Sequence, residues 1–299
     1  MSPGLAGRGW LSRPARAERG GAGTLELLLL LAGAAAVILL PRLFGDPQGV
    51  DPDSWRLTAY FAAVTAAVLL VRPMRQVAPL AFAFLTLGLP FSAWLWLLSY
   101  SGAVPAVLGG PNSLVRNAYA GVAWLVLALV MAGCFYRFTP RPKPNLRLWV
   151  RPTLGMLAMG VGGILLFLVI GFVLPAPLLG REGVPLQSLS GSAAVALGVA
   201  NATSAIAQEI QFRGVLMSAL ERQQSRLLAV LTQGVVFGFS HLVLQYGGPA
   251  ATFIPIVIGL GLIWGWMTVR TKSLLPAMLV HIVAEFFVLA VVLSGLYGG

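Results

Sequence analysis

The sequence contains little charge, only two histidines and a single cysteine. Charged residues make up 10% of its 299 residues, and the mean hydropathy is +0.86. A soluble domain carries about 25% charged residues. A disordered chain has a low content of apolar residues and a high content of charged ones. The composition therefore excludes both classes. The lone Cys134 excludes a disulfide framework and a Cys-based zinc site.

Long apolar runs account for most of the chain. Because one membrane crossing needs about 20 apolar residues, the runs predict an all-α, polytopic transmembrane helical bundle of about nine spans. The first run follows an Arg-rich leader, which a cleaved signal peptide also has, but its length favours a signal anchor. The second run is short and could lie in the membrane interface. The nine runs are about 24–44, 55–71, 77–100, 115–136, 153–174, 196–221, 226–244, 251–269 and 274–295.

Positive charge alternates between the connections of these runs. Of the 20 Lys and Arg residues, fifteen lie in the N-terminal tail and the second, fourth, sixth and eighth connections, and four lie in the others. Since cytoplasmic loops are enriched in Lys and Arg, we predict a cytoplasmic N-terminus and an outside C-terminus. The net charge of +11 is thus explained by basic connections beside membrane lipid. No nucleic-acid partner is expected.

The segment 137–152, RFTPRPKPNLRLWVRP, is basic and rich in proline. It predicts a cytoplasmic linker that divides the chain into two parts. Residues 1–152 then hold four transmembrane helices and the linker, and residues 153–299 hold five helices.

Ionisable side chains inside the runs are concentrated in the last four. Each such group costs about 2.5–3.5 kcal/mol on insertion scales, so each is a functional candidate. These candidates include both histidines of the chain. They are Glu209, Arg213, His241, His281 and Glu285.

The depth of these residues predicts one shared site. At about 1.5 Å per helical residue from the inner boundary, Glu209, His241 and Glu285 lie about 18, 22 and 20 Å deep on three different helices. Residues four apart share a helix face, which pairs Glu209 with Arg213 and His281 with Glu285. Structural interpretations stay open: the first pair could be a buried ion pair, and an intramembrane histidine often bonds a carbonyl of a neighbouring helix.

Several neutral residues also suggest how the helices pack. The pairs Gly234/Gly238 and Gly261/Gly265 have the small-xxx-small spacing of close helix contacts. Tryptophans such as Trp264 are interpreted as interface anchors or as packing residues.

A carboxylate and two imidazoles in a low-dielectric site can activate water, while other polar groups stabilise an oxyanion. A serine nucleophile is not expected, because Ser240 and His241 are adjacent and adjacent helix residues point apart. His241, His281 and a glutamate could bind zinc, but the HExxH pattern is absent, and we expect no metal and no cofactor. A proton-coupled transporter is the alternative, although we find no internal repeat of the kind such transporters show.

Three ordered motifs, 208-QEIQFRG-214, 237-FGFSH-241 and 281-HIVAE-285, resemble those of the CPBP family. This family comprises type II CAAX prenyl endopeptidases and bacteriocin-processing or immunity proteins, and its patterns are EExxxR, FxxxH and HxxxN. The resemblance covers about residues 195–295. It implies an intramembrane glutamic endopeptidase of the bacterial inner (plasma) membrane, with a peptide or protein substrate.

Two positions depart from the family pattern. The first Glu of EExxxR, which the family uses to activate water, is Gln208, and the Asn of HxxxN is Glu285. By resemblance, His241 helps to activate water, His281 polarises the scissile carbonyl, and Arg213 holds Glu209. Either acid and amide have exchanged places, with Glu285 as the base and Gln208 as an oxyanion donor, or the site is inactive and the protein is a scaffold or an immunity-type binder.

Overall fold

The computed structural model describes residues 20–43, 50–71, 78–99, 114–148, 151–173, 191–241 and 250–292. Every regular element in these ranges is helical. The elements are α1 (Gly20–Leu43), α2 (Val50–Leu70), α3 (Ala78–Ser99), α4 (Leu114–Phe138), α5 (Leu154–Val173), α6 (Gly191–Glu209), η7 (Ile210–Leu216), α7 (Met217–Leu220), α8 (Arg226–Ser240), α9 (Ala250–Thr271) and α10 (Leu275–Val292). Because α6, η7 and α7 follow one another without a break, the described ranges hold one continuous helix for each apolar run.

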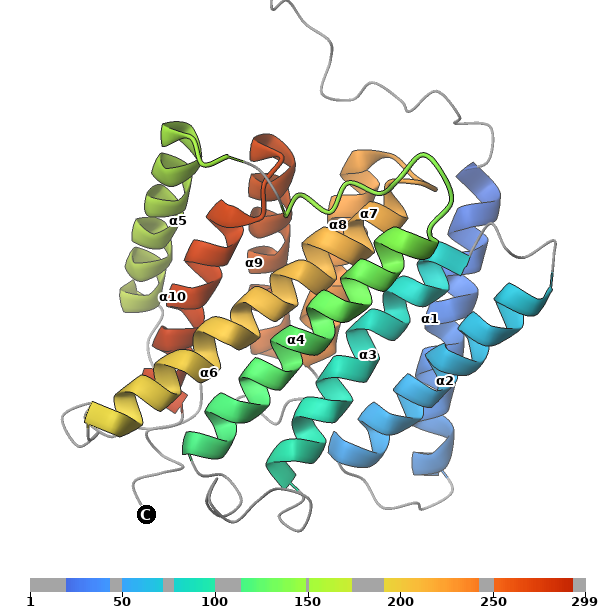
Figure 1. Cartoon of the computed structure of the whole chain (residues 1–299), viewed down its shortest axis with the longest axis horizontal. Helices are drawn as coiled ribbons and strands as arrows, with labels where there is room; N and C mark the ends of the chain where they lie inside the picture. The colour runs from blue at the N-terminus through green and yellow to red at the C-terminus, as the bar shows by residue number, and fades with distance from the viewer. Residues whose placement is uncertain are drawn as a thin grey trace, which may run out of the picture.

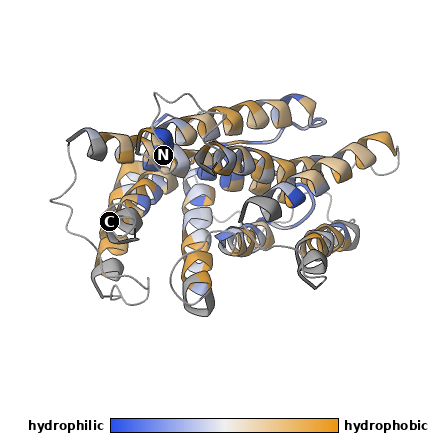
Figure 2. Ribbon diagram, turned by 90° about the horizontal axis from the view of Figure 1, so that it is seen from below, coloured by the Kyte–Doolittle hydropathy of each residue, from blue (hydrophilic) through white to orange (hydrophobic). Residues whose placement is uncertain are grey.

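The helices have the apolar surface of a membrane bundle. Figure 2 shows hydrophobic residues along most of their length, and side chains such as Leu154, Leu165 and Val169 are exposed. Within the described residues, three segments are long and apolar enough to cross a membrane: Ala78–Leu97, Val115–Phe138 and Ile254–Thr271. Five other apolar helical segments are shorter. A helical membrane protein is therefore supported, and the count of nine spans stays a prediction.

The continuous helix α6–η7–α7 lies in the middle of the bundle (Figure 1). It packs along α4 and against α10, while α3, α4 and α8 all contact η7. Every residue from 207 to 220 is buried. A helical segment that is buried all round belongs to the core, so the polar residues between positions 207 and 220 face other helices and not lipid.

The glycine spacings mark close contacts, as predicted. A Cβ on Gly261 of α9 would lie 3.1 Å from the Cα of Gly234 on α8 and 3.1 Å from the Phe237 ring. A Cβ on Gly265 would collide with the amide of Gln233. The small residues therefore let α8 and α9 approach each other directly beside the second motif.

The linker lies against the ends of α7 and α10. Arg147 Nη2 forms an ion pair with Glu221 at 2.6 Å, and Arg222 Nη1 donates to the Pro142 carbonyl at 2.7 Å. The Leu274 amide donates to the Arg147 carbonyl at 3.3 Å. These contacts place three basic connections at one end of the bundle, where the alternating helix directions of Figure 1 also bring them.

Some of the predicted charges are located differently or are not described. Arg116, one of the four basic residues assigned above to the outer connections, is 1% exposed within α4. The Arg residues of the N-terminal tail, Arg72, Arg75 and Arg181 lie outside the described residues. The same is true of the leader that bears on the signal-peptide alternative. The division of the chain at residue 152 stays a prediction, although α4 and α6 from its two sides pack together.

The orientation in the membrane can be tested with reporters. We expect a reporter inserted in the linker 137–152 to lie in the cytoplasm, because that end carries the excess of Lys and Arg. A reporter fused after Gly299 should lie outside, as an odd number of spans requires. Paired alkaline phosphatase and fluorescent-protein fusions measure both positions. A cytoplasmic signal from the C-terminal fusion would mean that one span is miscounted, with 55–71 as the first suspect.

Candidate functional site

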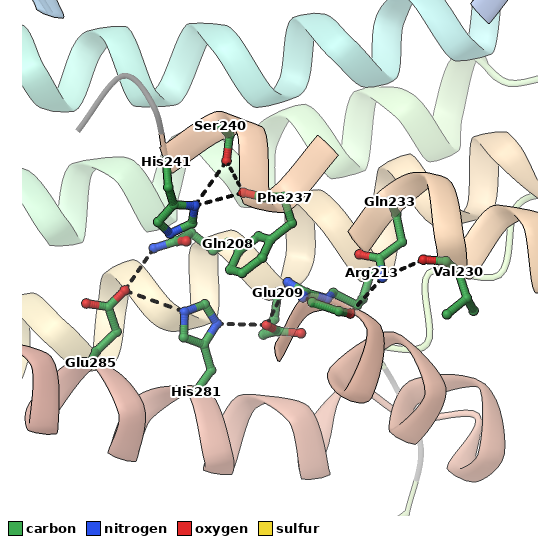
Figure 3. Close-up of polar contacts among 11 residues, drawn as sticks. Gln208, Glu209, Arg213, Val230, Gln233, Phe237, Ser240, His241, His281 and Glu285 are labelled. Atoms are coloured by element: carbon green, nitrogen blue, oxygen red, sulfur yellow. Dashed lines mark hydrogen bonds and ion pairs between the residues drawn. The ribbon is translucent and has the colours of Figure 1, made fainter. Parts of the chain in front are cut away.

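Glu209 is the last residue of α6, and the π-helix η7 begins at the next residue. The sequence pattern predicted an uninterrupted α-helix here, whereas the Met217 amide bonds the Phe212 carbonyl five residues back. π-turns of this kind are frequent at functional sites. The predicted pairing of Glu209 and Arg213 is nevertheless formed, with Arg213 Nη1 donating to Glu209 Oε1 at 3.0 Å (Figure 3).

His281 of α10 bonds the same carboxylate oxygen. Its Nδ1 lies 2.7 Å from Glu209 Oε1, and because a carboxylate oxygen accepts, Nδ1 carries the proton of this bond. The side chains of Glu209 and Arg213 are 0% exposed, and that of His281 is 3% exposed. One buried carboxylate therefore holds together a guanidinium and an imidazole from two helices.

Glu285 and Gln208, the two residues that depart from the family pattern, contact each other. Gln208 Nε2 donates to Glu285 Oε1 at 3.2 Å. The same oxygen lies 3.5 Å from Nε2 of His281, which is one helical turn earlier on α10. The Glu285 side chain is 22% exposed, the highest exposure among the charged groups of the site. The site is therefore most accessible at its Glu285 end.

His241 follows the last turn of α8. Its Nδ1 lies 2.8 Å from the Phe237 carbonyl, which can only accept, so Nδ1 carries the proton and the neutral ring keeps its lone pair on Nε2. Contrary to the expectation that adjacent side chains point apart, Ser240 Oγ lies 3.4 Å from this Nδ1. The Ser240 hydroxyl donates to the Phe237 carbonyl at 2.7 Å. A protonated Nδ1 cannot accept a proton from Ser240, so this proximity does not create a serine nucleophile.

The Phe237 ring lies against the Arg213 guanidinium and both imidazoles. Its centroid is 4.7 Å from that of His241 and 5.7 Å from that of His281, and the guanidinium carbon of Arg213 lies 4.2 Å from it. The distance between the two imidazole centroids therefore cannot exceed the sum of their distances from the Phe237 centroid. The structure brings the five predicted catalytic candidates and Arg213 into one site (Figure 3).

Sequence reasoning missed two buried side chains and a backbone carbonyl of this site. Trp264 of α9 stacks on the His281 ring at a centroid distance of 4.2 Å and is 2% exposed, so it is not an interface anchor. The Gly261 carbonyl accepts from Arg213 Nη2 at 3.3 Å and from Gln233 Nε2 at 2.8 Å. Gln233 could have been identified from the sequence, because it is a glutamine inside an apolar run, one turn before Phe237.

Gln211 connects the site helix to the N-terminal helices. Its Oε1 accepts from Trp124 Nε1 of α4 at 2.9 Å, and its amide nitrogen donates to the Thr86 carbonyl of α3. The side chain is 1% exposed and lies two residues after Glu209. Helices α3 and α4 therefore support the back of the site.

In the described part of the chain, no three His, Cys, Asp or Glu side chains are grouped so that they could hold a metal ion. Glu209 Oε1 instead accepts from Arg213 and His281, and Nδ1 of His241 bonds the Phe237 carbonyl. The chemistry that this arrangement offers is proton transfer between carboxylate and imidazole groups, with an amide beside them as a hydrogen-bond donor.

A bundle of apolar helices around a buried cluster of acid, amide and imidazole groups is typical of a helical membrane protein with a polar site in its core. Residues 190–287 match the family model described as Type II CAAX prenyl endopeptidase Rce1-like. This is a protease family, and the match supports the CPBP membership that the three motifs predicted. The matched region contains all three motifs, and α1 to α5 lie outside it. No curated protein and no solved structure matches the chain.

Proposed function

We propose that the protein is an intramembrane glutamic-type endopeptidase in which the acid and the amide of the first and third motifs have exchanged places. The hydrogen bond of 3.2 Å between Gln208 and Glu285 carries this proposal. Because the two departing positions contact each other, exchanging their side chains leaves one carboxylate and one amide in the same site. If the changes at positions 208 and 285 had each only inactivated the site, there would be no reason for the second one to introduce a Glu.

Glu285 serves as the general base. It is the site's most exposed charged group, so it can meet a water molecule and a substrate. The carboxylate takes a proton from water, and the water oxygen bonds the scissile carbonyl carbon. The proton then passes to the leaving nitrogen as the carbon–nitrogen bond breaks. His241, with its lone pair on Nε2, assists in orienting the water.

Gln208 and His281 stabilise the charge that develops. An amide NH₂ has two donors, of which Gln208 uses one on Glu285, so the second can be donated to the oxyanion. Nε2 of His281 lies 3.5 Å from Glu285 Oε1 and can share the proton that the carboxylate has taken. Glu209 acts by position and not as the base, since its Oε1 already accepts two bonds and its side chain is fully buried.

The non-catalytic alternative also has an observation in its favour. Glu209, Arg213 and His281 are buried and bond one another, as the members of a structural network do. In this alternative the network only ties α6, η7 and α10 together, and the protein acts as a membrane scaffold or an immunity-type binder.

A double exchange distinguishes the two branches. We expect the protein in liposomes to cleave at least one substrate class among prenylated CAAX peptides and unmodified membrane-spanning peptides, with mass spectrometry as the readout. Gln208→Glu combined with Glu285→Asn restores the family pattern and should keep or raise this cleavage. Gln208→Glu alone should cleave less, because it sets two carboxylates against each other in one buried site. If wild type and double variant are both inert while binding of a partner survives Glu285→Gln, the non-catalytic branch is the better account.

A further inference from the structure

Trp264 lies in the site although its helix, α9, carries none of the three motifs. Its indole stacks on the His281 imidazole with a centroid distance of 4.2 Å and an interplanar angle of 27°. The Phe237 ring meets the same imidazole edge-on, at 5.7 Å and 88°. One flat face of His281 is therefore covered by Trp264, and Phe237 restricts the ring from another direction.

The orientation of the His281 ring determines both of its polar contacts. Nδ1 bonds Glu209 at 2.7 Å, and Nε2 faces Glu285 at 3.5 Å. Both contacts use lone-pair or N–H directions that lie in the plane of the imidazole. The terminal torsion of histidine is broad and has no sharp preferred value of its own. A rotation of the ring would misalign both contacts together, so something outside the side chain must fix its plane.

We propose that Trp264 is a positioning residue, which fixes the ring plane of His281 between Glu209 and Glu285. An indole face also attracts a cation, so the stack favours the imidazolium that forms when His281 shares the proton of Glu285. The catalytic consequence rests on the function proposed above, whereas the orientation of the ring can be measured without any activity.

Helix α9 is held close enough for this contact by its glycines. Gly261 lies against Gly234 of α8, and its carbonyl accepts from Arg213 and Gln233. The same turn of α9 thus fixes Arg213 through a backbone carbonyl and His281 through Trp264. Both hydrogen-bond partners of Glu209, Arg213 and His281, are therefore in contact with α9, a helix that carries none of the three motifs.

The chain has only two histidines, so selective ¹⁵N-histidine labelling of the full-length protein in lipid nanodiscs gives two assignable rings. His281→Gln identifies the ring N–H that is bonded to Glu209. We expect Trp264→Leu to speed the exchange of this proton with water by at least about 10-fold, because an unrestrained ring opens the bond more often. Trp264→Phe keeps an aromatic face and should stay near wild type. Trp266→Leu, on the same helix but 45% exposed, is the matched control and should not change the signal.

Trp264→Met provides a second nonaromatic variant with an unbranched, more adaptable side chain, and it serves as the test if the Leu variant does not fold. A His281 N–H that exchanges at the wild-type rate in the folded Leu or Met variant overturns the proposal. In the cleavage assay, Trp264→Leu should lower kcat by about 10–10²-fold with little change in KM, since only the geometry of a reacting group is lost. If wild type cleaves nothing, the proposed function fails, and the exchange measurement still tests the positioning role.

Discussion

Replacing Glu285 by Gln is expected to lower cleavage by about 10⁴-fold, the upper end of what general acid–base catalysis contributes. Glutamine keeps the size and an oxygen acceptor for Gln208 but cannot take a proton. The other carboxylate, Glu209, is fully buried and already accepts bonds from Arg213 and His281, so it cannot replace the lost base. Initial rates in liposomes, with protein folding checked by thermal melting, measure this effect.

Glu26→Gln is the matched control, because Glu26 lies in α1 and is only partly buried there. It should cleave like wild type. Gln208→Ala removes one proposed oxyanion donor and should cost less than Glu285→Gln, about 10²–10³-fold. A Glu285→Gln enzyme that cleaves at more than a tenth of the wild-type rate would show that the base is another group.

The sequence predicted the members of the site better than their bonds. Depth along separate helices was enough to group Glu209, His241 and Glu285, because ionisable groups in a membrane gather where they can satisfy one another. The spacing of four residues predicted the Glu209–Arg213 pair. No pattern indicated that Nδ1 of His281 bonds Glu209 while Nε2 faces Glu285, since that choice depends on how α10 is rotated against α6.

Two other features could not be read from the sequence for physical reasons. The segment IQFRGVL forms a π-helix although its own residues suit an ordinary helix. All seven residues are buried and the segment contacts α3, α4 and α8, and tertiary packing of this kind overrides local helix propensity. Trp264 and Trp266 are two residues apart in one apolar run, and both suit an interface or a core. Only the packing of α9 on α8 shows that one is 2% exposed and the other 45%.

Replacing Arg213 by Met is expected to lower the free energy of unfolding by about 3–5 kcal/mol, because it leaves a buried charge without its partner. The guanidinium bonds Glu209 at 3.0 Å and the Gly261 carbonyl at 3.3 Å, and it lies 4.2 Å from the Phe237 ring centre. Met fills much of the volume but makes none of these polar contacts. Reversible unfolding in mixed micelles, followed by tryptophan fluorescence, measures the loss.

A second substitution separates the charge from the packing. Glu209→Gln together with Arg213→Met removes both charges, and the new amide oxygen can still accept from Nδ1 of His281. Because replacing a buried pair by neutral groups costs far less than breaking it, the double variant should recover most of the lost stability. Arg226→Met is the control, since Arg226 pairs with Glu221 at 3.6 Å but is 57% exposed, and its loss should change stability by no more than about 1 kcal/mol. If Arg213→Met lowers the free energy of unfolding by no more than this control does, the prediction is wrong. Protonated His281 alone then compensates the charge of Glu209.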